Sequence, residues 1–313
     1  MAVEWAEDWR PPHAVDMAGV DEILRGGYDL HVHAAPDMRP RQMDVVRLVE
    51  EYRSAGFSGA LIKDHFLPTV GRSYVLNAWR QDFRCLGSCA LNTPSGGFNA
   101  AHVEAAVAEG AVWVFMPTAT AAHFVNYTGR TPETERLLRG ATRPQSVLDG
   151  GVLRPEVHEV LEVLAARDVV LASGHLSPAE TRVLFAEARR KGIDRRVVTH
   201  ASIDFIDMPL ELQLELAADG AIIEHCYVSC LWHRPIALKR VLHQVRAVGP
   251  ARCYLASDLG QPENPSPVTG LRAAVGGLQA LGLSRRELRQ LVVDTPRSLV
   301  PPVPPSGVSG RSA

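Results

Sequence analysis

The sequence predicts an α/β protein, a single-domain (β/α)8 TIM barrel with an N-terminal extension and a long loop after its fourth strand. Three observations indicate this fold. Short apolar runs alternate with longer segments of helical periodicity, eight such pairs fit within the 313 residues, and no glycine-rich dinucleotide-binding fingerprint follows the first run. Eight strand–helix repeats in a chain of this length are typical of a closed parallel barrel.

The expected strands and helices alternate along the whole chain. The eight strand–helix pairs are 28–33 with 43–55, 59–65 with 71–80, 85–91 with 99–109, 111–116 with 155–167, 169–174 with 178–191, 196–200 with 209–219, 221–225 with 235–247, and 253–257 with 271–281. Several of these helices begin at a proline, whose missing N–H costs nothing in the first turn, and several end at a glycine. The continuous apolar run at 169–172 is typical of a parallel strand covered by helices.

Three regions stand outside the repeat. We assign residues 1–300 to the barrel domain, with an extension before about residue 21. Residues 118–151 connect the fourth strand to its helix on the side of the barrel mouth, where they are expected to form a lid or a substrate wall. Residues 301–313, rich in proline, serine and glycine, are expected to be a disordered tail.

Composition and charge exclude several classes of protein. The formal net charge is −2, with 33 basic and 35 acidic residues and no dense basic block, which disfavours a nucleic-acid partner. No run approaches the roughly 20 apolar residues that span a bilayer, and the first ten residues lack the apolar region of a secretory signal. We therefore expect a cytoplasmic protein with a small-molecule substrate and no membrane partner. The sequence leaves homo-oligomerisation open.

The five cysteines are expected to be reduced thiols. Cys85 and Cys89, and also Cys226 and Cys230, have a spacing that invites a zinc interpretation. In a strand, however, four residues span about 13 Å, which is too far for both members of the first pair to reach one tetrahedral ion. A structural zinc site at either pair is disfavoured.

Histidines at expected strand ends are the strongest chemical signal. His31 and His33 are two residues apart in a strand, so both imidazoles face the same side, where they can chelate a divalent metal. His175, His200 and Asp258 end the fifth, sixth and eighth strands. Closure of the barrel brings the eighth strand beside the first, so Asp258 is expected next to His31 and His33, at the rim that carries barrel active sites.

This set of residues resembles the amidohydrolase superfamily of metal-dependent barrel enzymes. The resemblance runs from the first histidine pair to Asp258, and residues 294–299 are similar to the family's C-terminal Asn-Pro-Ala-x-x-Leu turn. The flanking segments HVHAAPD, SGHLSPAE and SDLGQPENP resemble an uncharacterised branch of the superfamily.

The resemblance implies that His31, His33 and Asp258 hold one divalent metal, with zinc as the expected ion. It further implies that His175 and His200 hold a second ion, or that one of them completes the first site. Members of this superfamily often use a carboxylated lysine or a glutamate from the fourth strand to bridge two ions. This strand ends instead in Phe-Met-Pro-Thr at 115–118, so one ion and two ions both remain open.

Lys63 and His65 are the next candidates, because they share one face of the second strand. Lys63 is a candidate metal ligand as a carbamate or a candidate base, and the alternatives are a pair with a carboxylate or contact with an anionic substrate group. His65 is a candidate catalytic residue. Glu224 and His225, adjacent in one strand, cannot both face inward. Three residues on expected mouth loops are candidate substrate contacts: Arg72, Asn92 and Tyr127.

The expected activity is hydrolysis of an amide, lactam or lactone bond in a small molecule. The nucleophile would be a metal-activated water, with Asp258 as general base and then general acid. One alternative is non-oxidative decarboxylation by a mononuclear member of the same superfamily. A third hypothesis is a non-catalytic metal-binding barrel, which the number of candidate ligands at an open mouth disfavours.

Overall fold

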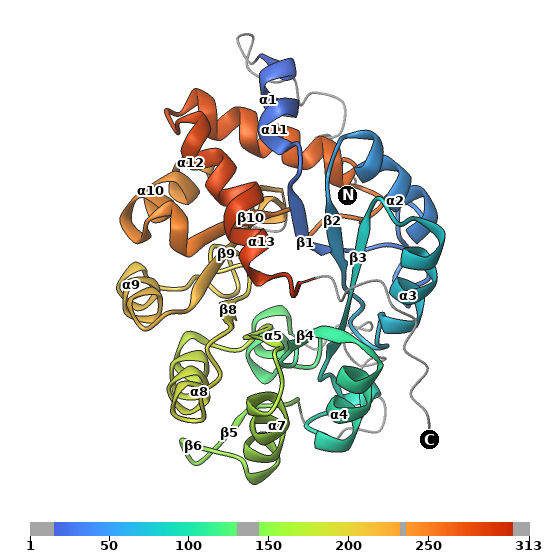
Figure 1. The fold of residues 1–313 in the computed structure, drawn as a ribbon. Coiled ribbons are helices and arrows are strands. Elements are labelled where there is room, and N and C mark those ends of the chain that lie inside the picture. Colours follow the sequence, from blue (N-terminus) through green and yellow to red (C-terminus); the bar gives the residue numbers. More distant parts are fainter. Residues whose placement is uncertain (1–15, 130–143, 232–235, 303–313) are drawn as a thin grey trace.

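The computed structural model describes residues 16–129, 144–231 and 236–302, which form a closed parallel barrel with helices around it (Figure 1). The eight strands of the sheet follow one another in chain order. They are β1 Tyr28–Val32, β2 Gly59–Ile62, β3 Arg84–Ala90, β4 Ala111–Phe115, β7 Val170–Ala172, β8 Arg196–Val198, β9 Ile222–Cys226 and β10 Cys253–Ala256. The predicted TIM barrel is confirmed.

Two backbone hydrogen bonds close the barrel just beyond the ends of its first and last strands. The amide of Asp258 donates to the carbonyl oxygen of His31 at 2.7 Å, and the amide of His33 donates to that of Leu259 at 2.9 Å. Closure removes both sheet edges, which would otherwise leave unpaired backbone groups. The same closure places the first and eighth strand ends together, as the sequence predicted.

The covering helices surround the strands in the view of Figure 1. They are α2 Val45–Ser54, α3 Val70–Trp79, α4 Ala100–Glu109, α7 Pro155–Ala165, α8 Pro178–Arg190, α9 Leu210–Ala218, α10 Leu238–Val248 and α11 Pro267–Ala280. The helix expected at 271–281 begins four residues earlier, at Pro267. Its N-cap is Ser266, whose side chain accepts a hydrogen bond from the amide of Thr269. Glycines inside this helix weaken the helical signal in its sequence.

The long connection after β4 carries structure that the sequence did not predict. It contains the helix α5 Ala122–Thr128, and its end overlaps the hairpin of β5 Leu148–Asp149 and β6 Val152–Leu153, while 130–143 lie outside the described residues. Two hydrogen bonds join α5 to the loop after β8, from Tyr127 Oη to Asp204 Oδ2 at 2.7 Å and from His123 Nε2 to the carbonyl oxygen of Phe205 at 2.6 Å. The helix therefore forms a wall at the mouth of the barrel.

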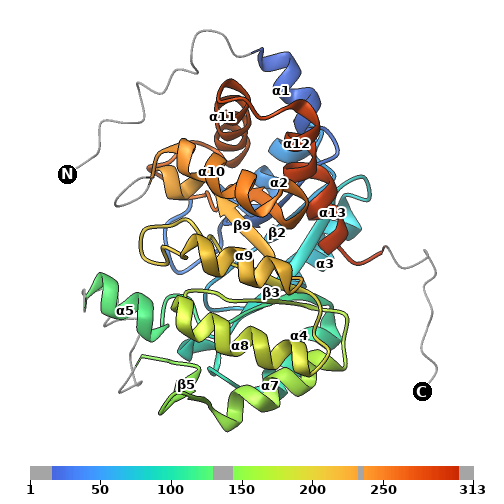
Figure 2. The ribbon, with the colours of Figure 1, turned by 90° about the vertical axis from the view of Figure 1, so that its left-hand side faces the viewer.

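The ends of the described chain pack on the barrel away from its mouth. Helix α1 Met17–Leu24 lies against α11, where Arg272 pairs with Asp21 at 2.7 Å. After α12 Arg285–Arg289 and a π-helical turn, α13 Thr295–Leu299 lies on the opposite side of the barrel from α5 (Figure 2). Residues 1–15 of the predicted extension and 303–313 of the predicted tail lie outside the described residues. None of the helices described is both long enough and apolar enough to cross a membrane.

Strand β9 separates two buried polar residues by its alternation. Glu224 points towards the barrel interior, where it contacts His31, whereas His225 contacts Ser202 and thereby the helix α10. Ser202 Oγ donates to Gln244 Oε1 at 2.6 Å, so it accepts the proton of His225 Nδ1 at 2.8 Å. The prediction that only one of the two faces inward is confirmed.

His225 should make the stability of the fold depend on pH. Burial lowers the pKa of His225 to about 4, whereas an unfolded histidine has a pKa of about 6.5. Between these values the folded state binds fewer protons, so its stability is complete above about pH 6.5 and falls as the pH drops towards 4. In metal-free protein, His225→Gln should reduce this loss by up to about 3 kcal/mol, since one pKa unit corresponds to about 1.4 kcal/mol.

The measurement is urea unfolding at about pH 7 and about pH 4 in the presence of a chelator. His243→Gln, which removes an exposed histidine from helix α10, next to Gln244, is the matched control. An equal loss of stability on acidification in His225→Gln and in the unaltered protein would contradict the prediction.

Candidate metal centre

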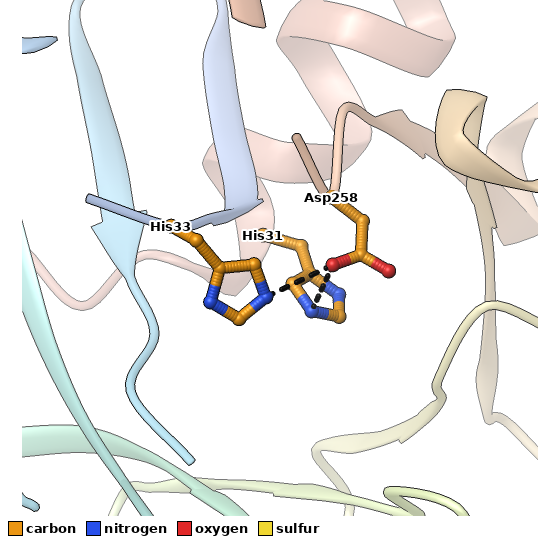
Figure 3. Close-up of side chains that lie close together, drawn as sticks. All are labelled: His31, His33 and Asp258. Carbon is orange, nitrogen blue, oxygen red and sulfur yellow. Dashed lines mark hydrogen bonds and ion pairs between the residues drawn. The ribbon is translucent and has the colours of Figure 1, made fainter. Parts of the chain in front are cut away.

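Three side chains from the two ends of the barrel sequence meet at its mouth (Figure 3). Asp258 Oδ1 lies 3.1 Å from His31 Nε2 and 3.0 Å from His33 Nε2. The side chains of both histidines are almost completely buried, at 0% and 2% exposed. The structure thus brings together the three residues that the sequence expected around one ion.

The chain bends sharply where it delivers these groups. His200 and Asp258 follow the ends of β8 and β10 with φ values of 29° and 51°, in the left-handed region that non-glycine residues rarely adopt. Gly260, with φ at 126°, passes so close to the carbonyl oxygen of His33 that a Cβ there would clash. Such backbone strain persists where surrounding contacts fix it, and it clusters at functional sites.

Glu224 on β9 is a member of the site that sequence analysis did not assign. Its two oxygens lie 3.2 and 3.1 Å from His31 Nδ1, the nitrogen opposite the one that faces Asp258. Tyr254 Oη donates to Glu224 at 2.6 Å, and so does the backbone amide of His200, also at 2.6 Å. A carboxylate on the far nitrogen of a metal-binding histidine fixes the tautomer and orientation of its ring. The signal in the sequence was the shared face of Glu224 and Cys226 in their strand.

Lys63, just beyond β2, lies next to His31. Its Nζ is 2.9 Å from His31 Nε2 and 4.7 Å from the centre of the Phe115 ring, and the side chain is buried. Burial lowers the pKa of Lys63, although Asp258 and Glu224 oppose that effect. The candidate base or ligand therefore lies within reach of the three-residue cluster.

The remaining predicted histidines continue the cluster around the mouth. The ring centres of His175 and His200 are 4.8 Å apart, and His200 lies 5.7 Å from His31. His65, on the other side, lies 5.1 Å from His33, and its Nδ1 is 2.9 Å from Thr118 Oγ1. All the predicted metal-site residues thus gather at one end of the barrel.

Charge in the site is arranged around neutral imidazoles. Burial lowers the pKa of His33, His65 and His175 well below the usual range, and it lowers the pKa of His200 to about 4. Neutral imidazole is the form that binds a metal ion.

The two carboxylates are anionic in spite of their burial. Burial by itself would raise the pKa of Asp258, but His31 and His33 outweigh it and hold that pKa well below its usual range. Burial would raise the pKa of Glu224 as well, yet His31 brings it to about 2. His31 itself, between these carboxylates, has a raised pKa against the effect of burial. The centre therefore favours a positive charge between Asp258 and Glu224.

The donor set fits a divalent cation. Ligand atoms of His31, His33 and Asp258 all lie within 4.8 Å of one another. In addition, Nδ1 of His175 and Nδ1 of His200 are buried without a hydrogen-bond partner in the described part of the chain. Unpaired buried nitrogens are costly, and a ligand that accepts their lone pairs would remove that cost. Nitrogen and oxygen donors of this kind are usual for zinc and other first-row divalent ions.

A cavity of about 470 Å³ opens onto the candidate metal centre. Six of its lining residues belong to the cluster: His33, Lys63, His65, His175, His200 and Asp258. Its side walls include Phe124 from α5 and Phe205 from the loop after β8, and Arg39 and Arg41 from the loop after β1. The sequence did not single out these four wall residues. The two arginines in the run Asp-Met-Arg-Pro-Arg at 37–41, shortly after His33, were the available signal.

The three predicted substrate contacts do not appear among the described residues that line this cavity. Arg72 pairs with Asp64 Oδ2 at 2.7 Å, and Tyr127 bonds to the loop after β8. Asn92 is fully buried, and it donates to the carbonyl oxygen of His65 at 2.6 Å while accepting from the amide of Thr118 at 2.9 Å. Their role in substrate binding stays a prediction, whereas these contacts hold the rim in place.

The cysteines do not form disulfides, and four of the five are buried. Cys85 and Cys89 are the second and sixth residues of β3, as the argument against a shared ion assumed. Cys226 Sγ lies 3.7 Å from His31 Nδ1, on the Glu224 side of that ring. Together with Glu224 it completes a second group of close donor atoms around the same histidine.

Comparison with solved structures supports the fold assignment. The barrel is similar to an amidohydrolase from Pseudomonas aeruginosa, with a TM-score of 0.60 and 11% identity over 90% of this chain and 98% of that one. It is also similar to a 2-pyrone-4,6-dicarboxylic acid hydrolase, described as putative, from Pseudomonas putida, with a TM-score of 0.52 and 17% identity over 88% and 97%. These likenesses show that the predicted barrel fold is correct.

A third solved structure, an amidohydrolase from Burkholderia multivorans, has a TM-score of 0.54 and 14% identity over 87% of this chain and 98% of that one. The model of a protein family of unknown function matches residues 26–224 of the sequence. No curated protein matches the sequence significantly.

Removal of the Glu224 carboxylate should weaken metal binding. In Glu224→Gln, the amide loses the negative charge that orients His31, and we expect the affinity for Zn²⁺ to fall about 10- to 100-fold. Competition with a chromogenic chelator measures this affinity directly.

The matched control is Glu180→Gln, which removes another buried carboxylate, one that caps α8 and contacts Ser146. This control should lower stability and leave the zinc affinity unchanged. If Glu224→Gln bound Zn²⁺ as tightly as the unaltered protein, the positioning role of Glu224 would be wrong.

Proposed function

This chain belongs to DUF6282, the family of unknown function whose model it matches over residues 26–224, and we propose that it is a metal-dependent hydrolase of the amidohydrolase superfamily. The proposed reaction is hydrolysis of an amide, lactam or lactone bond in a small molecule. The proposed ligands are His31, His33 and Asp258 for one divalent ion. His175 and His200 would bind at the same centre or at a second one beside it.

One observation carries this proposal, the contact of a single carboxylate oxygen with two metal-type imidazoles at the open end of a barrel. Asp258 Oδ1 is within 3.1 Å of both His31 and His33, and the cavity reaches imidazole ligand atoms, a carboxylate that can carry a proton, and a lysine. A closed structural ion site would need neither the cavity nor the additional donors.

A bound divalent ion would polarise the substrate carbonyl and lower the pKa of a water molecule. The residues of the chain would then handle protons and charge. Asp258 takes a proton from the attacking water as the C–O bond forms, and it returns that proton to the departing nitrogen or oxygen as the scissile bond breaks. Its second oxygen, the one without a contact to the two imidazoles in Figure 3, would carry this proton.

Lys63 and His65 would support the same step from the other side of the cavity. Lys63 Nζ, beside His31, is placed to stabilise negative charge that develops on the substrate oxygen. His65 has its Nδ1 committed to Thr118, which leaves Nε2 to contact the leaving group. Exclusion of bulk water by the walls of α5 and the loop after β8 would strengthen these interactions.

A second candidate function is non-oxidative decarboxylation at a mononuclear centre. The observation that favours it is the end of β4, where residues 115–118 are Phe-Met-Pro-Thr. The one polar side chain among them, Thr118, contacts His65 and Asn92. The end of β4 therefore offers no carboxylate or lysine to bridge two ions. A metal count per chain, together with analysis of the products for CO2, separates this reaction from hydrolysis.

Replacement of Asp258 by asparagine should lower kcat/KM much more than it lowers the metal content of the protein. On a panel of esters, amides and lactones, we expect Asp258→Asn to lower kcat/KM about 10²- to 10⁴-fold for any substrate that the unaltered protein hydrolyses, because the proton carrier is gone. Metal content by mass spectrometry, after loading with Zn²⁺, accompanies every rate.

The matched control is Asp149→Asn, on the exposed hairpin of β5 and β6, which should retain the full rate. Full turnover by metal-loaded Asp258→Asn would contradict the assigned role. A protein that binds no divalent ion would contradict the proposed function as a whole, and a metal-loaded barrel without activity on the entire panel would favour the non-catalytic alternative.

A further inference from the structure

We infer that the substrate of this site carries a carboxylate group, which is bound by Arg41, with Arg39 beside it at the mouth of the cavity. The inference rests on the proposed function and narrows its substrate class. It starts from the loop after β1, which follows His33 directly and adds two guanidinium groups to the lining of the cavity.

Arg41 is a buried and rigidly held cation. Its Nε and Nη2 lie 2.8 and 2.7 Å from Asp37 Oδ2, and the side chains of Arg41 and Asp37 are only 2% and 0% exposed. Asp37 Oδ1 also accepts the backbone amide of Arg39 at 3.0 Å, which fixes the loop that carries both arginines. A buried ion pair is expensive to desolvate, and it is weak evidence for a stabilising role. A guanidinium that is already ordered is, however, well prepared to bind an anion.

The contacts of His33 show why Arg41 needs a partner. Nδ1 of His33 lies 3.0 Å from the carbonyl oxygen of Lys63 and 3.1 Å from Arg41 Nη2. The carbonyl can only accept a hydrogen bond and the guanidinium can only donate one, so a single tautomer satisfies only one of them.

Metal binding decides between these two contacts. If Nε2 is the ligand atom, the ring proton must be on Nδ1, where it donates to the carbonyl oxygen of Lys63. The N–H of Arg41 Nη2 that points at His33 then faces a donor and loses its acceptor, while the contacts with Asp37 remain. A buried charged donor without an acceptor is costly, and an anionic oxygen of a substrate next to the metal centre would satisfy it.

The rest of the cavity fits an organic acid. The cationic groups of its lining are Arg39, Arg41 and Lys63. Of the two acidic lining residues, Asp258 is already held by two imidazoles, and Glu263 is the other. The lining also has an apolar and aromatic part, with Phe124, Phe205, Ile203 and Val228.

These walls indicate a small acid in which a planar or apolar body faces the phenylalanines and the carboxylate faces Arg41. The planar fork of a guanidinium matches the geometry of a carboxylate, which it can bind through two parallel hydrogen bonds. A phosphate would be the other anion to consider, and it is an outcome of the experiment below.

The experiment measures binding instead of turnover. Benzoate is titrated into Zn²⁺-loaded protein by calorimetry, with benzamide as the neutral isostere and phenyl phosphate as the alternative anion. We expect benzoate to bind more tightly than either of the other probes. Arg41→Gln should lower the affinity for benzoate about 10- to 100-fold, because a charge-assisted hydrogen bond is lost, and should leave the affinity for benzamide unchanged. Arg41→Lys, which keeps the charge and loses the fork, should fall between the two.

Arg272→Gln is the matched comparison, because the Nε and Nη2 of Arg272 also contact an aspartate, Asp21, at 2.7 and 3.2 Å, yet Arg272 does not line the cavity. It should bind benzoate as the unaltered protein does. Metal content and thermal unfolding of each variant verify that the centre is intact. If Arg41→Gln does not fold, the comparison of Arg41→Lys with Arg272→Gln decides the question.

Three outcomes would overturn the inference: equal benzoate affinity in the unaltered protein and the Arg41 variants, a loss in Arg272→Gln in place of Arg41→Gln, or tighter binding of phenyl phosphate than of benzoate. A failure of this kind is distinguishable from failure of the proposed function. If benzoate binding does not depend on Arg41 in a protein that still binds Zn²⁺ and hydrolyses a substrate, only the inference of a substrate carboxylate is refuted. If benzoate binding depends on Arg41 in a protein that hydrolyses nothing, the proposed hydrolase function is refuted and the inference of an acid-binding site stands.

Discussion

The seam between β1 and β10 closes the barrel and builds the candidate metal centre with the same residues. The backbone of His31 and His33 pairs with that of Asp258 and Leu259, while the side chains of the first three meet at 3.0–3.1 Å. Asp29 reinforces this seam, since its Oδ1 accepts the amides of His31 and Ser257. Loss of the seam would therefore open the sheet and separate the ligands together, so fold and chemistry depend on one set of contacts.

Burial of so many ionisable groups has a cost that only mutual contacts offset. Asp258 and Glu224 remain anionic in the interior because they flank His31, and the other imidazoles of the mouth are neutral because burial penalises their charged form. The left-handed backbone at His200 and Asp258 adds strain at the same rim. A barrel without a ligand to bind would be more stable with apolar residues at these positions. The arrangement is thus best explained by a cation that the carboxylates attract and the neutral imidazoles hold.

The sequence was sufficient to predict the barrel and the gathering of the candidate ligands at one rim, because both follow from periodicity. Residues two apart in a strand share a face, and parallel strands end at one rim, so His31, His33, His200 and Asp258 could be brought together without coordinates. The sequence showed that only one of Glu224 and His225 can face the barrel interior, but the choice depends on which face of β9 meets the barrel axis. That choice is made by tertiary packing, which places His225 against Ser202 and Gln244.

The structure of the loops could not be predicted from periodicity. Arg41 acquires its place through an ion pair with Asp37 inside a loop of irregular backbone, and Arg72 makes a similar pair with Asp64 that turns it away from the cavity. Residue type alone cannot distinguish these two arginines. Helix α5 was missed for a related reason, because it is short and its position depends on contacts with the loop after β8.

The loop after β1 links metal binding to recognition of the substrate. His33 continues the strand, and the carbonyl oxygen of Lys63 selects the tautomer of its ring. That tautomer leaves the N–H of Arg41 that points at His33 without an acceptor, although Arg41 keeps its contacts with Asp37. The preference for an acid would then be strongest when the ion is bound, since the ion sets the ring proton that frees the guanidinium. Metal and acid would each favour binding of the other, as reciprocal linkage requires. Such coupling would make the site bind its substrate tightly only when it is equipped to act on it.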